Sequence, residues 1–324
     1  MLLAWPNGSD GLLSSPMSGT SAITIGNFDG VHLGHVELVA AARQAVGASG
    51  RVIALSFDPH PLTVLRPDKT PKRLTTFQQR QDLLTKAGAD EVVPLRPTGD
   101  FLKLEAQEFL EWITSKYKPD FIVEGEDFHF ARARQGNIKT VIEGQAKYGY
   151  SSIIIETVKT ILTDHSIVRA SSSMVRWLIE RGRVRDASIL LDRPFELCCE
   201  IVSGDKRGRD LGVPTANLNH LDYALPEDGI YCGFAIADDG KRYAAAISVG
   251  TKPTFGKHPR LCEAHLLDYQ GDLDHYGWTI KLQFHDWIRD QLKFNSVELL
   301  VEQLKRDINK TRKRCDMNLA QSIC

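Results

Sequence analysis

The sequence predicts an α/β protein with an N-terminal doubly wound parallel sheet and a C-terminal small antiparallel β-barrel that ends in a helix. In the first half, apolar strands alternate with helical segments at about thirty residues per strand–helix unit, which is typical of a parallel sheet with helices on both faces. In the second half, strand follows strand with turn signals between them, which is typical of a small antiparallel barrel or sandwich. The 324 residues are enough for about two domains.

The expected elements follow from these two patterns. In the first half, we expect strands at Ala22–Ile25, Val52–Phe57, Glu91–Leu95, Phe121–Glu124 and Ser152–Glu156, separated by helices at His32–Val46, Phe77–Ala87, Glu105–Lys116 and Ile138–Tyr148. In the second half, we expect strands at Phe195–Val202, Gly229–Ala237, Tyr243–Val249, Cys262–Tyr269 and Thr279–Trp287. The domain boundaries are placed to give a loose, Gly- and Ser-rich arm over 1–20, a first domain over 21–187 and a second over 188–324.

A last helix is expected to open at Asn295, whose spacing from Glu298 is that of a capping box. Its apolar stripe would pack against the barrel and consists of Val297, Leu300, Val301, Leu304 and Ile308. The basic run 310–314 that follows is interpreted as a solvated helix end, where cations face the negative end of the dipole, rather than as a nucleic-acid patch.

Composition and charge exclude several classes of protein. The formal net charge of −1 gives no reason to expect nucleic-acid or membrane partners, and no apolar run approaches the length of a membrane span. The first residues lack the basic start and the length of a signal peptide. Six cysteines without a C-x-x-C pair argue against a disulfide framework or a zinc site and for a reducing cytoplasm, with the thiols as small buried apolar groups.

The segment Gly26–His35 carries the strongest functional signal, because it places a glycine-rich turn between the first strand and the first helix. A helix N-terminus with free N–H groups is an anion site, and the spacing of His32 and His35 puts both on one face of that helix. Gly34 is expected to leave room for a phosphate. The pattern is neither a dinucleotide fingerprint nor a Walker A loop, and it favours an enzyme that holds a nucleoside triphosphate. The candidate phosphate-binding residues here are Gly26, Asn27, Phe28, Asp29, Gly30 and Gly34.

Other candidates in the first half are weaker when taken alone. A second anion site is expected at the start of a helix that carries Arg176 one turn in, with the hydroxyls of Ser171, Ser172 and Ser173; an N-cap beside a surface arginine is the alternative. Pro59 and Pro61 form a stiff turn that presents His60, although a plain loop is an equal reading. After the fourth strand, Phe128 and Phe130 beside Asp127 could flank a flat ring or anchor a buried loop, and we expect Arg132 and Arg134 to be exposed.

The second half holds a dense basic and glycine-rich motif over 204–217. Backbone N–H groups and cations in such a loop can enclose phosphates, here with Gly204, Lys206, Gly208, Arg209 and Gly212. Thr215 and Asn217 offer uncharged oxygen ligands to a Mg²⁺ that travels with ATP. A basic hairpin followed by a strand is the alternative.

Glu263 stands in a strand-like run in which alternation puts it on one face with Leu261, His265 and Leu267. A carboxylate on a mostly apolar face is a candidate general base, and a structural ion pair is the equal alternative.

Taken together and in order, these motifs resemble those of the bacterial bifunctional riboflavin kinase/FAD synthetase family over about residues 20–312. The matching segments are Gly26–His35, Pro59–Pro61, Asp127–Phe130, Ser171–Arg176, Gly204–Asn217, Pro226–Tyr231, Gly250–Phe255 and Glu263–Asp268. The resemblance implies a Rossmann-like nucleotidyltransferase domain, the FMN adenylyltransferase, followed by a riboflavin kinase barrel, with riboflavin, FMN and ATP as small-molecule substrates and Mg²⁺ as cofactor. It also implies a cytoplasmic protein, expected as a monomer or weak homo-oligomer.

The resemblance implies roles for these residues. In the kinase half, Glu263 would take the proton of the riboflavin 5′-hydroxyl while Thr215 and Asn217 hold Mg²⁺. In the adenylyltransferase half, His32 and His35 would bind phosphoryl oxygens, and Asn27, Ser172 and Arg176 would hold the phosphate chain. Pro59, His60, Asp127, Phe128, Phe130 and Arg289 are the expected flavin contacts.

The chain departs from the family pattern at four places. Ser173 replaces a threonine, which keeps the hydroxyl. Ala131 and Asp192 stand where glycine is usual, and alanine would be strained if a positive φ is needed at 131. Gln291 replaces a glutamate and loses a charge near the expected flavin site. These departures bear on FAD synthesis and flavin affinity more than on ATP binding.

Two other readings stay open. One is an adenylyltransferase that acts on pantetheine phosphate or nicotinate mononucleotide, which the histidine motif alone does not exclude, although the 204–217 motif disfavours it. The other is a non-catalytic flavin-binding or regulatory protein that keeps the fold, for which Ala131 and Gln291 are the only hints.

Overall fold

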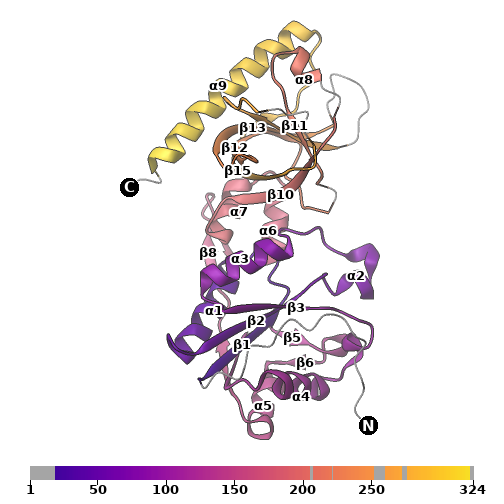
Figure 1. The fold of residues 1–324 in the computed structure, drawn as a ribbon, viewed down its shortest axis with the longest axis vertical. Coiled ribbons are helices and arrows are strands. Elements are labelled where there is room, and N and C mark those ends of the chain that lie inside the picture. The colour runs from indigo at the N-terminus through magenta and orange to yellow at the C-terminus, as the bar shows by residue number, and fades with distance from the viewer. Residues whose placement is uncertain (1–18, 205–206, 221, 252–259, 272–275, 322–324) are drawn as a thin grey trace.

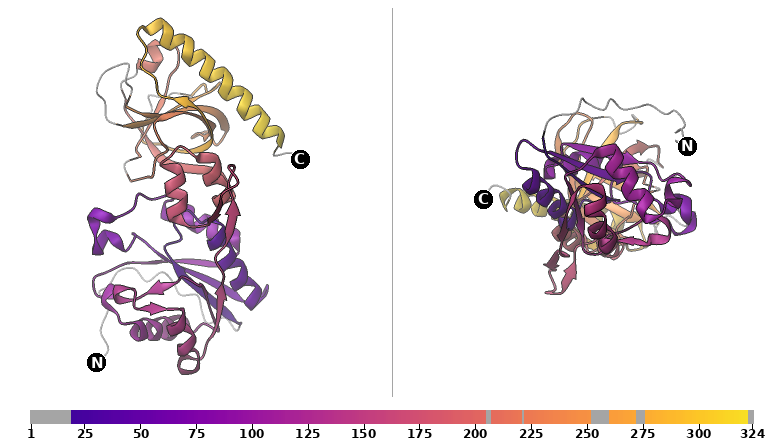
Figure 2. Two further views of the ribbon diagram at one scale, coloured as in Figure 1. Left: turned by 180° about the vertical axis from the view of Figure 1, so that it is seen from behind. Right: turned by 90° about the horizontal axis from the view of Figure 1, so that it is seen from below.

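The computed structural model describes residues 19–204, 207–220, 222–251, 260–271 and 276–321. The molecule is elongated, with a sheet-containing lobe at one end, a barrel at the other, and helices α6 (Ser172–Ile179) and α7 (Val184–Leu191) between them (Figures 1 and 2).

The N-terminal lobe is built on a five-stranded parallel sheet of order β3-β2-β1-β4-β7, as the sequence predicts. Its strands are β1 (Ser21–Gly26), β2 (Arg51–Phe57), β3 (Glu91–Leu95), β4 (Phe121–Gly125) and β7 (Ser151–Ile155). The strand order reverses between β1 and β4, and ligands of such sheets bind beyond the carboxyl ends of the strands at that point. There the ladder stops at Ile23 and Ile122, and the buried Glu124 side chain accepts a hydrogen bond from the Ile25 N–H at 2.7 Å.

Helices cover both faces of this sheet. The face that presents Ala22, Val52 and Val123 packs against α1 (Leu33–Val46) and α3 (Phe77–Ala87). The opposite face packs against α4 (Ala106–Tyr117) and α5 (Ile138–Tyr148). Strict alternation along each strand therefore serves two apolar layers, which is why the strands read as continuous apolar runs. The five strands of this sheet and the four helices packed on it all lie within one residue of their expected bounds.

Short elements that the sequence pattern did not predict connect these units. They are α2 (Leu62–Leu65), the 3₁₀ turns η1 (Pro67–Lys69), η2 (Phe101–Lys103) and η3 (Arg132–Arg134), and two hairpins, β5 (His129–Phe130) with β6 (Gly136–Asn137) and β8 (Lys159–Ile161) with β9 (Ile167–Arg169). Strands of two or three residues carry too little alternation to be recognised.

The C-terminal lobe is a closed antiparallel barrel of order β10-β11-β14-β13-β12-β15, so the barrel reading is confirmed over the sandwich. Its strands are β10 (Phe195–Val202), β11 (Ala216–Leu218), β12 (Gly229–Ile236), β13 (Arg242–Gly250), β14 (Leu261–Leu266) and β15 (Thr279–Asp290). The short helix α8 (Arg207–Asp210) lies inside the glycine-rich motif, and β11 begins at the end of that motif, where a following strand was expected only as the alternative.

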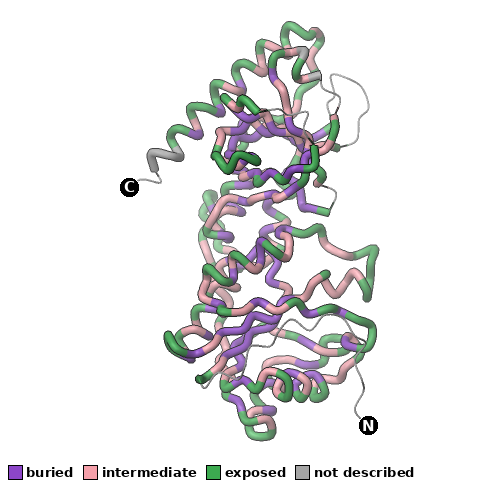
Figure 3. Tube along the Cα trace, in the orientation of Figure 1, coloured by how far each residue is buried: buried purple, intermediate pink, exposed green. Residues whose placement is uncertain are grey.

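One apolar core spans the barrel and the two helices next to it. Val175, Leu178 and Leu190 of α6 and α7 belong to the same buried cluster as Phe195 and Phe284 of the barrel. The burial colours of Figure 3 show this continuity from α6 and α7 into the barrel. The domain boundary near residue 188 remains a prediction, and α7 ends just beyond it at Leu191.

The last helix, α9 (Val297–Gln321), corrects two expectations. Its first turn is capped by Ser296, whose Oγ accepts from the Leu299 N–H at 3.3 Å, and not by Asn295. Val297 is 47% exposed, and the described residues that α9 buries most deeply are Asp307, Thr311 and Cys315.

The basic run 310–314 is not a solvated helix end, because α9 continues beyond it. Arg314 pairs with Asp286, Arg312 donates two hydrogen bonds to Asp268, and Lys310 donates to the Ile288 carbonyl at 3.0 Å. These cations fasten α9 to the barrel.

The two glycine replacements fall at positive φ. Ala131 has φ 63° and ψ −173°, a region that only glycine enters without strain, so the expected strain is confirmed. Asp192 has φ 53° and ψ 27° as the C-cap of α7, which a short polar side chain tolerates better.

The described cysteines are free thiols. Among the described cysteines, Cys199, Cys232, Cys262 and Cys315 are buried, Cys198 is half-buried, and all are free. Within the described ranges, no helix has the length and apolar character needed to cross a membrane.

Candidate functional site

The Gly26–His35 turn is strained and held from several sides. Phe28 and Val31 have positive φ values of 50° and 41°, which are unusual for residues with bulky side chains. Gly30 also has a positive φ of 84°, and its N–H donates to Thr75 Oγ1 at 3.0 Å. Such conformations persist only where the surrounding structure holds them, and they concentrate at functional sites.

The two histidines lie together, as their spacing predicts. His32 is the N-cap of α1, and its ring stacks on the His35 ring with centroids 3.7 Å apart. Phe28 is buried and contacts the His35 ring edge-on at 5.0 Å. A Cβ on Gly34 would come within 3.2 Å of the His32 ring. This glycine therefore makes room for the imidazole, which corrects the expectation that it leaves room for a phosphate.

Both imidazoles are held neutral. Burial, with help from the charge of Arg193, lowers the pKa of His32 to about 4. Burial and the adjacent His32 lower the pKa of His35 well below its usual value. The Nδ1 atoms of both rings are buried and have no hydrogen-bond partner.

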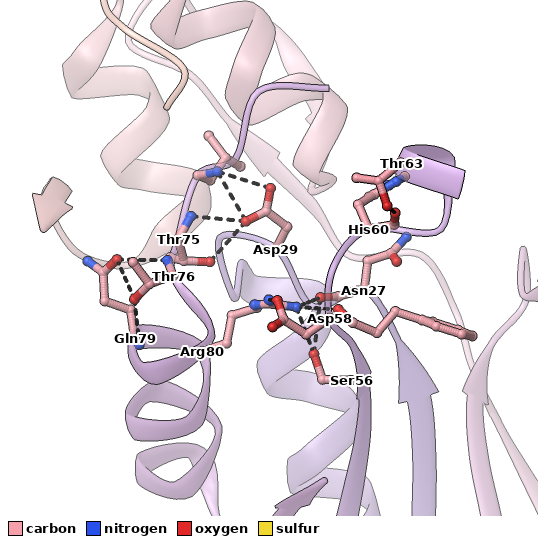
Figure 4. Close-up of polar contacts among 12 residues, drawn as sticks. Asn27, Asp29, Ser56, Asp58, His60, Thr63, Thr75, Thr76, Gln79 and Arg80 are labelled. Carbon is pink, nitrogen blue, oxygen red and sulfur yellow. Dashed lines mark hydrogen bonds and ion pairs between the residues drawn. The ribbon is translucent and has the colours of Figure 1, made fainter. Parts of the chain in front are cut away.

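Asp29 organises the turn instead of facing a phosphate. Its carboxylate accepts from the N–H groups of Leu74 and Thr75 at 3.0–3.1 Å and from Thr75 Oγ1 at 2.9 Å (Figure 4). It also forms an ion pair with Arg176, and both side chains are nearly buried. This corrects the expectation that Asp29 contacts phosphate, because its oxygens are committed to the protein.

The serines of the second anion site have separate tasks. Ser171 caps α6 by accepting from the Met174 N–H at 3.1 Å, which is the N-cap alternative. Ser172 Oγ donates to the Asp29 carbonyl at 2.7 Å, and Ser173 is exposed. Arg176 lies one turn in and donates from Nε to the Lys72 carbonyl at 2.7 Å. The structure therefore brings the start of α6 to the Gly26–His35 turn, across more than 130 residues of sequence.

Arg80 is a buried arginine that the sequence analysis missed. From α3 it donates to the Asn27 carbonyl and Ser56 Oγ at 2.9 Å each and to the Phe57 carbonyl at 2.7 Å, and it pairs with Asp58 (Figure 4). It thus joins the carboxyl ends of β1 and β2. A lone arginine in an ordinary helix gives no sequence signal, because its partners are backbone carbonyls on other elements.

A cavity of about 450 Å³ opens at these strand ends. It brings together five of the expected residues, Asn27, Asp29, Pro59, His60 and Arg176, whereas His32 and His35 are not among the residues that line it. Its cationic lining consists of Lys72, Arg73, Arg80 and Arg176, and its apolar lining includes Phe57 and Phe77.

Two further polar residues of this cavity are His60 and Asn27. His60 Nδ1 accepts from the Leu62 N–H at 3.1 Å, which leaves Nε2 as the ring's N–H donor. The Asn27 Oδ1 atom is buried with no partner. Asp29, Asp58 and Asp222 also line the cavity, and the first two pair with Arg176 and Arg80. The cavity therefore combines cationic side chains with apolar walls, which suits a phosphorylated aromatic ligand.

The aromatic segment after β4 lies outside this cavity. Phe130 is buried and packs on Phe109 at 5.1 Å, and Phe128 stacks on Phe130 at 5.3 Å. Asp127 is exposed and lies 3.5 Å from Arg169. The structure therefore places Phe130 as a loop anchor, the alternative reading, and does not bring these three residues to the other expected flavin contacts. Arg132 and Arg134 are exposed, as expected.

The barrel candidates lie together on the outer face of the barrel. We call Thr215, Asn217, Ser248 and Glu263 the barrel row. Glu263 on β14 is paired with Asn217 on β11 and with Ser248 on β13. Thr215 Oγ1 lies 3.5 Å from Glu263 Oε1. Glu263 shares its face with His265, whose Nδ1 lies 2.7 Å from the Pro214 carbonyl oxygen. The alternating residues of β14 face the core, so Glu263 lies outside the barrel lumen.

The glycine-rich loop folds over this row. A Cβ on Gly204 would collide with the Asn217 amide, and one on Gly208 would lie 3.4 Å from Thr215 Oγ1. Gly212 needs a positive φ of 73°. Arg209 is exposed on the loop, whereas Lys206 and residues 252–255 of the Gly250–Phe255 motif lie outside the described residues.

Arg289 is committed to a structural ion pair. Its Nε and Nη2 donate to the Asp307 carboxylate of α9 at 2.6–3.0 Å and its Nη1 donates to the Asp290 carbonyl, which corrects its assignment as a flavin contact. Gln291 reaches the row itself, since its Nε2 donates to Ser248 Oγ at 3.3 Å and its Oε1 accepts from the Thr251 N–H at 3.2 Å. The amide thus replaces a charge with a donor that a glutamate would lack.

Fold and sites together define a two-lobed enzyme of the nucleotidyltransferase and kinase classes. A FAD synthetase family model matches residues 15–170, and a riboflavin kinase family model matches residues 191–315. The chain belongs to the bifunctional riboflavin kinase/FMN adenylyltransferase family.

Relatives match nearly the whole chain. The bifunctional riboflavin kinase/FMN adenylyltransferase of Escherichia coli strain K12 is 32% identical over 306 residues, which cover 93% of this chain and 94% of the relative. That of Bacillus subtilis strain 168 is 31% identical over 296 residues, covering 89% and 90%. A crystal structure described as a macrolide-efflux protein from Streptococcus pneumoniae has a TM-score of 0.79 and 30% identity, covering 92% of this chain and 96% of that one.

Proposed function

We propose that the barrel phosphorylates riboflavin to FMN and that the N-terminal lobe adenylylates FMN to FAD, each with ATP. The observation that carries this proposal is the presence of two separate sites, one at the ends of β1 and β2 and one on the outer face of β11, β13 and β14. The family supports both reactions in one chain.

In the N-terminal lobe, an oxygen of the FMN phosphate attacks the α-phosphorus of ATP. The new P–O bond forms as the bond to the β-phosphate breaks, and pyrophosphate leaves. His32 and His35 lie at the N-terminus of α1, where they would donate hydrogen bonds to phosphoryl oxygens as charge moves to the leaving group. Arg176, already fixed by Asp29, would hold the phosphate chain, and Asn27 has an unpartnered oxygen for a donor on the substrate.

In the barrel, the riboflavin 5′-hydroxyl attacks the γ-phosphorus of ATP, and ADP leaves. Glu263 is placed to accept the hydroxyl proton as the new bond forms. The loop that contains Gly204, Gly208 and Gly212 would enclose the nucleotide phosphates with backbone N–H groups. Neither reaction needs a covalent enzyme intermediate, so positioning and electrostatic stabilisation do most of the catalysis.

Mg²⁺ suits the donors of the barrel row. Thr215 and Asn217 offer hydroxyl and amide oxygens, the hard uncharged ligands that Mg²⁺ accepts beside phosphate and water. Among the described residues, no group of three or more His, Cys, Asp or Glu could hold a metal, which fits an ion that takes most of its ligands from phosphate and water. Such an ion would neutralise charge on the transferred phosphoryl group.

The proposal also covers the partners, the compartment and the oligomeric state of the protein. The partners are the small molecules riboflavin, FMN and ATP, without nucleic acid or membrane. We place the protein in the cytoplasm, as a monomer or weak homo-oligomer, because free buried thiols suit a reducing compartment.

One incubation tests the proposal. The protein with ATP, Mg²⁺ and riboflavin should yield FMN and then FAD, separated by chromatography, and FMN supplied directly should yield FAD and pyrophosphate. An adenylyltransferase for another substrate would leave riboflavin unchanged, and a non-catalytic flavin protein would consume no ATP. Either result would refute the proposal.

A further inference from the structure

Arg193 joins the barrel lobe to the histidine turn. It lies between α7 and β10, and its side chain reaches back across the boundary between the lobes. Its Nη1 donates to the Val31 carbonyl at 3.0 Å and to the Leu191 carbonyl at 2.9 Å, and its Nη2 donates to the Gly30 carbonyl at 2.5 Å. One guanidinium therefore fixes two consecutive carbonyls directly before His32.

The carbonyls that Arg193 binds belong to the strained part of the turn. Val31 is β-branched and has φ 41°, and Gly30 has φ 84°. A bidentate cation on these two carbonyls holds the backbone in this conformation and sets the direction in which the chain enters α1. On the other side, the Gly30 N–H is held by Thr75, so the turn is fixed from both lobes.

We propose that Arg193 is a positioning residue for adenylyl transfer, which holds the Gly30–Val31 peptides so that His32 and His35 face the triphosphate. This inference rests on the proposed function of the N-terminal lobe. The guanidinium of Arg193 is committed to main-chain carbonyls of the turn and of α7, so Arg193 acts through the turn and not on the substrate.

The charge of Arg193 has a second effect on the same turn. Burial lowers the pKa of Arg193 to about 10, so it is still protonated at neutral pH. Its charge is one of the causes that lower the pKa of His32, together with Arg176 and against Asp29. For His35 it acts together with His32 and Arg80.

The experiment compares Arg193→Met and Arg193→Lys in the full chain, measuring FMN adenylylation and riboflavin phosphorylation separately. Arg193→Met should lower kcat of adenylylation on the order of 10- to 100-fold, with KM for FMN and ATP changed less than about twofold. Arg193→Lys should recover part of this loss, because an ammonium can still donate to the carbonyls. Riboflavin phosphorylation should stay within about twofold of wild type and reports that the barrel is folded.

Tyr223→Phe is the matched control, because Tyr223 also contacts both lobes. Its hydroxyl donates to the Cys198 carbonyl at 2.7 Å and to Gln79 Oε1 at 3.5 Å but does not contact the turn. It should leave both activities near wild type. An equal loss in Tyr223→Phe, a rise in KM alone, unchanged adenylylation in Arg193→Met, or parallel loss of both activities would each overturn the inference. Absence of adenylylation in the wild type would instead refute the proposed function.

Discussion

The rings of His32 and His35 stack at 3.7 Å with both Nδ1 atoms buried and unpartnered. Two stacked imidazoles can remain so close in a buried place only if both are neutral, since two imidazolium ions there would repel each other. Neutral rings at the N-terminus of α1 can donate hydrogen bonds to phosphoryl oxygens without carrying a charge that would need a counter-ion. Three of the predictions below depend on this site or on its separation from the barrel.

His32→Ala should abolish most FAD formation and spare FMN formation. Loss of one positioned donor to a developing charge typically costs about 10²- to 10³-fold in kcat, and Glu263 and the barrel row lie in the other lobe. The two reactions are followed separately, from FMN and from riboflavin. His129→Ala is the control, since His129 is exposed. An equal loss of both products would contradict the assignment.

Glu263→Gln should stop riboflavin phosphorylation while supplied FMN still becomes FAD. The amide keeps the shape of the side chain but cannot accept the hydroxyl proton, so a loss of about 10²- to 10⁴-fold is expected for a general base. Glu200→Gln, an exposed change in the same barrel, should have no effect. Riboflavin phosphorylation at the wild-type rate would remove Glu263 from this role.

Ala131→Gly should stabilise the protein by about 1 kcal/mol, because glycine adopts the φ of 63° and ψ of −173° without the strain that alanine stores there. The measurement is a denaturant melt of both proteins. Ala146→Gly, at an exposed position inside α5, should have the opposite sign and cost about 1 kcal/mol. If Ala131→Gly destabilised to the same extent, the conformation described for residue 131 would be wrong.

Acid should destabilise the fold through His32. Its pKa is about 4 in the folded protein against an ordinary 6.5, so between these values the unfolded chain binds more protons. The contribution of His32 to the free energy of unfolding is therefore complete above pH 6.5. It falls as the pH drops toward 4, by on the order of 3 kcal/mol. His35 acts in the same direction.

Urea melts from pH 7.5 to 4.5 test this expectation. His32→Asn should flatten the fall in unfolding free energy over that range, whereas His129→Asn should keep the wild-type slope. Identical slopes for His32→Asn and the wild type would show that the imidazole is not protected from protons in the folded state.

The sequence predicts the parallel sheet well because its strands are mostly apolar runs and three of the four helices packed on it end at a glycine, such as Gly88 after α3. It gives a strand at β11 only as an alternative, since three residues at the end of a glycine-rich motif carry no usable alternation. It places the N-cap of α9 one residue early, because Asn295 and Ser296 are both good caps.

The site is predicted less completely than the fold. His32 and His35 are found because their spacing is local. Asp29 is given the wrong task, because its partners are backbone N–H groups 45 and 46 residues away. Arg80 and Arg193 bind main-chain carbonyls, and no pattern of side chains along the sequence records such contacts.

Helix α6 contacts both lobes of the molecule. Its apolar side is buried with the barrel, while its first turn places Ser172 and Arg176 against the loop that follows β1. α6 therefore links the pocket at the ends of β1 and β2 to the core of the barrel. A change in the orientation of the barrel relative to the parallel sheet would move Arg176 relative to the rings of His32 and His35. The geometry of the FAD-forming site therefore depends on how the two lobes are oriented.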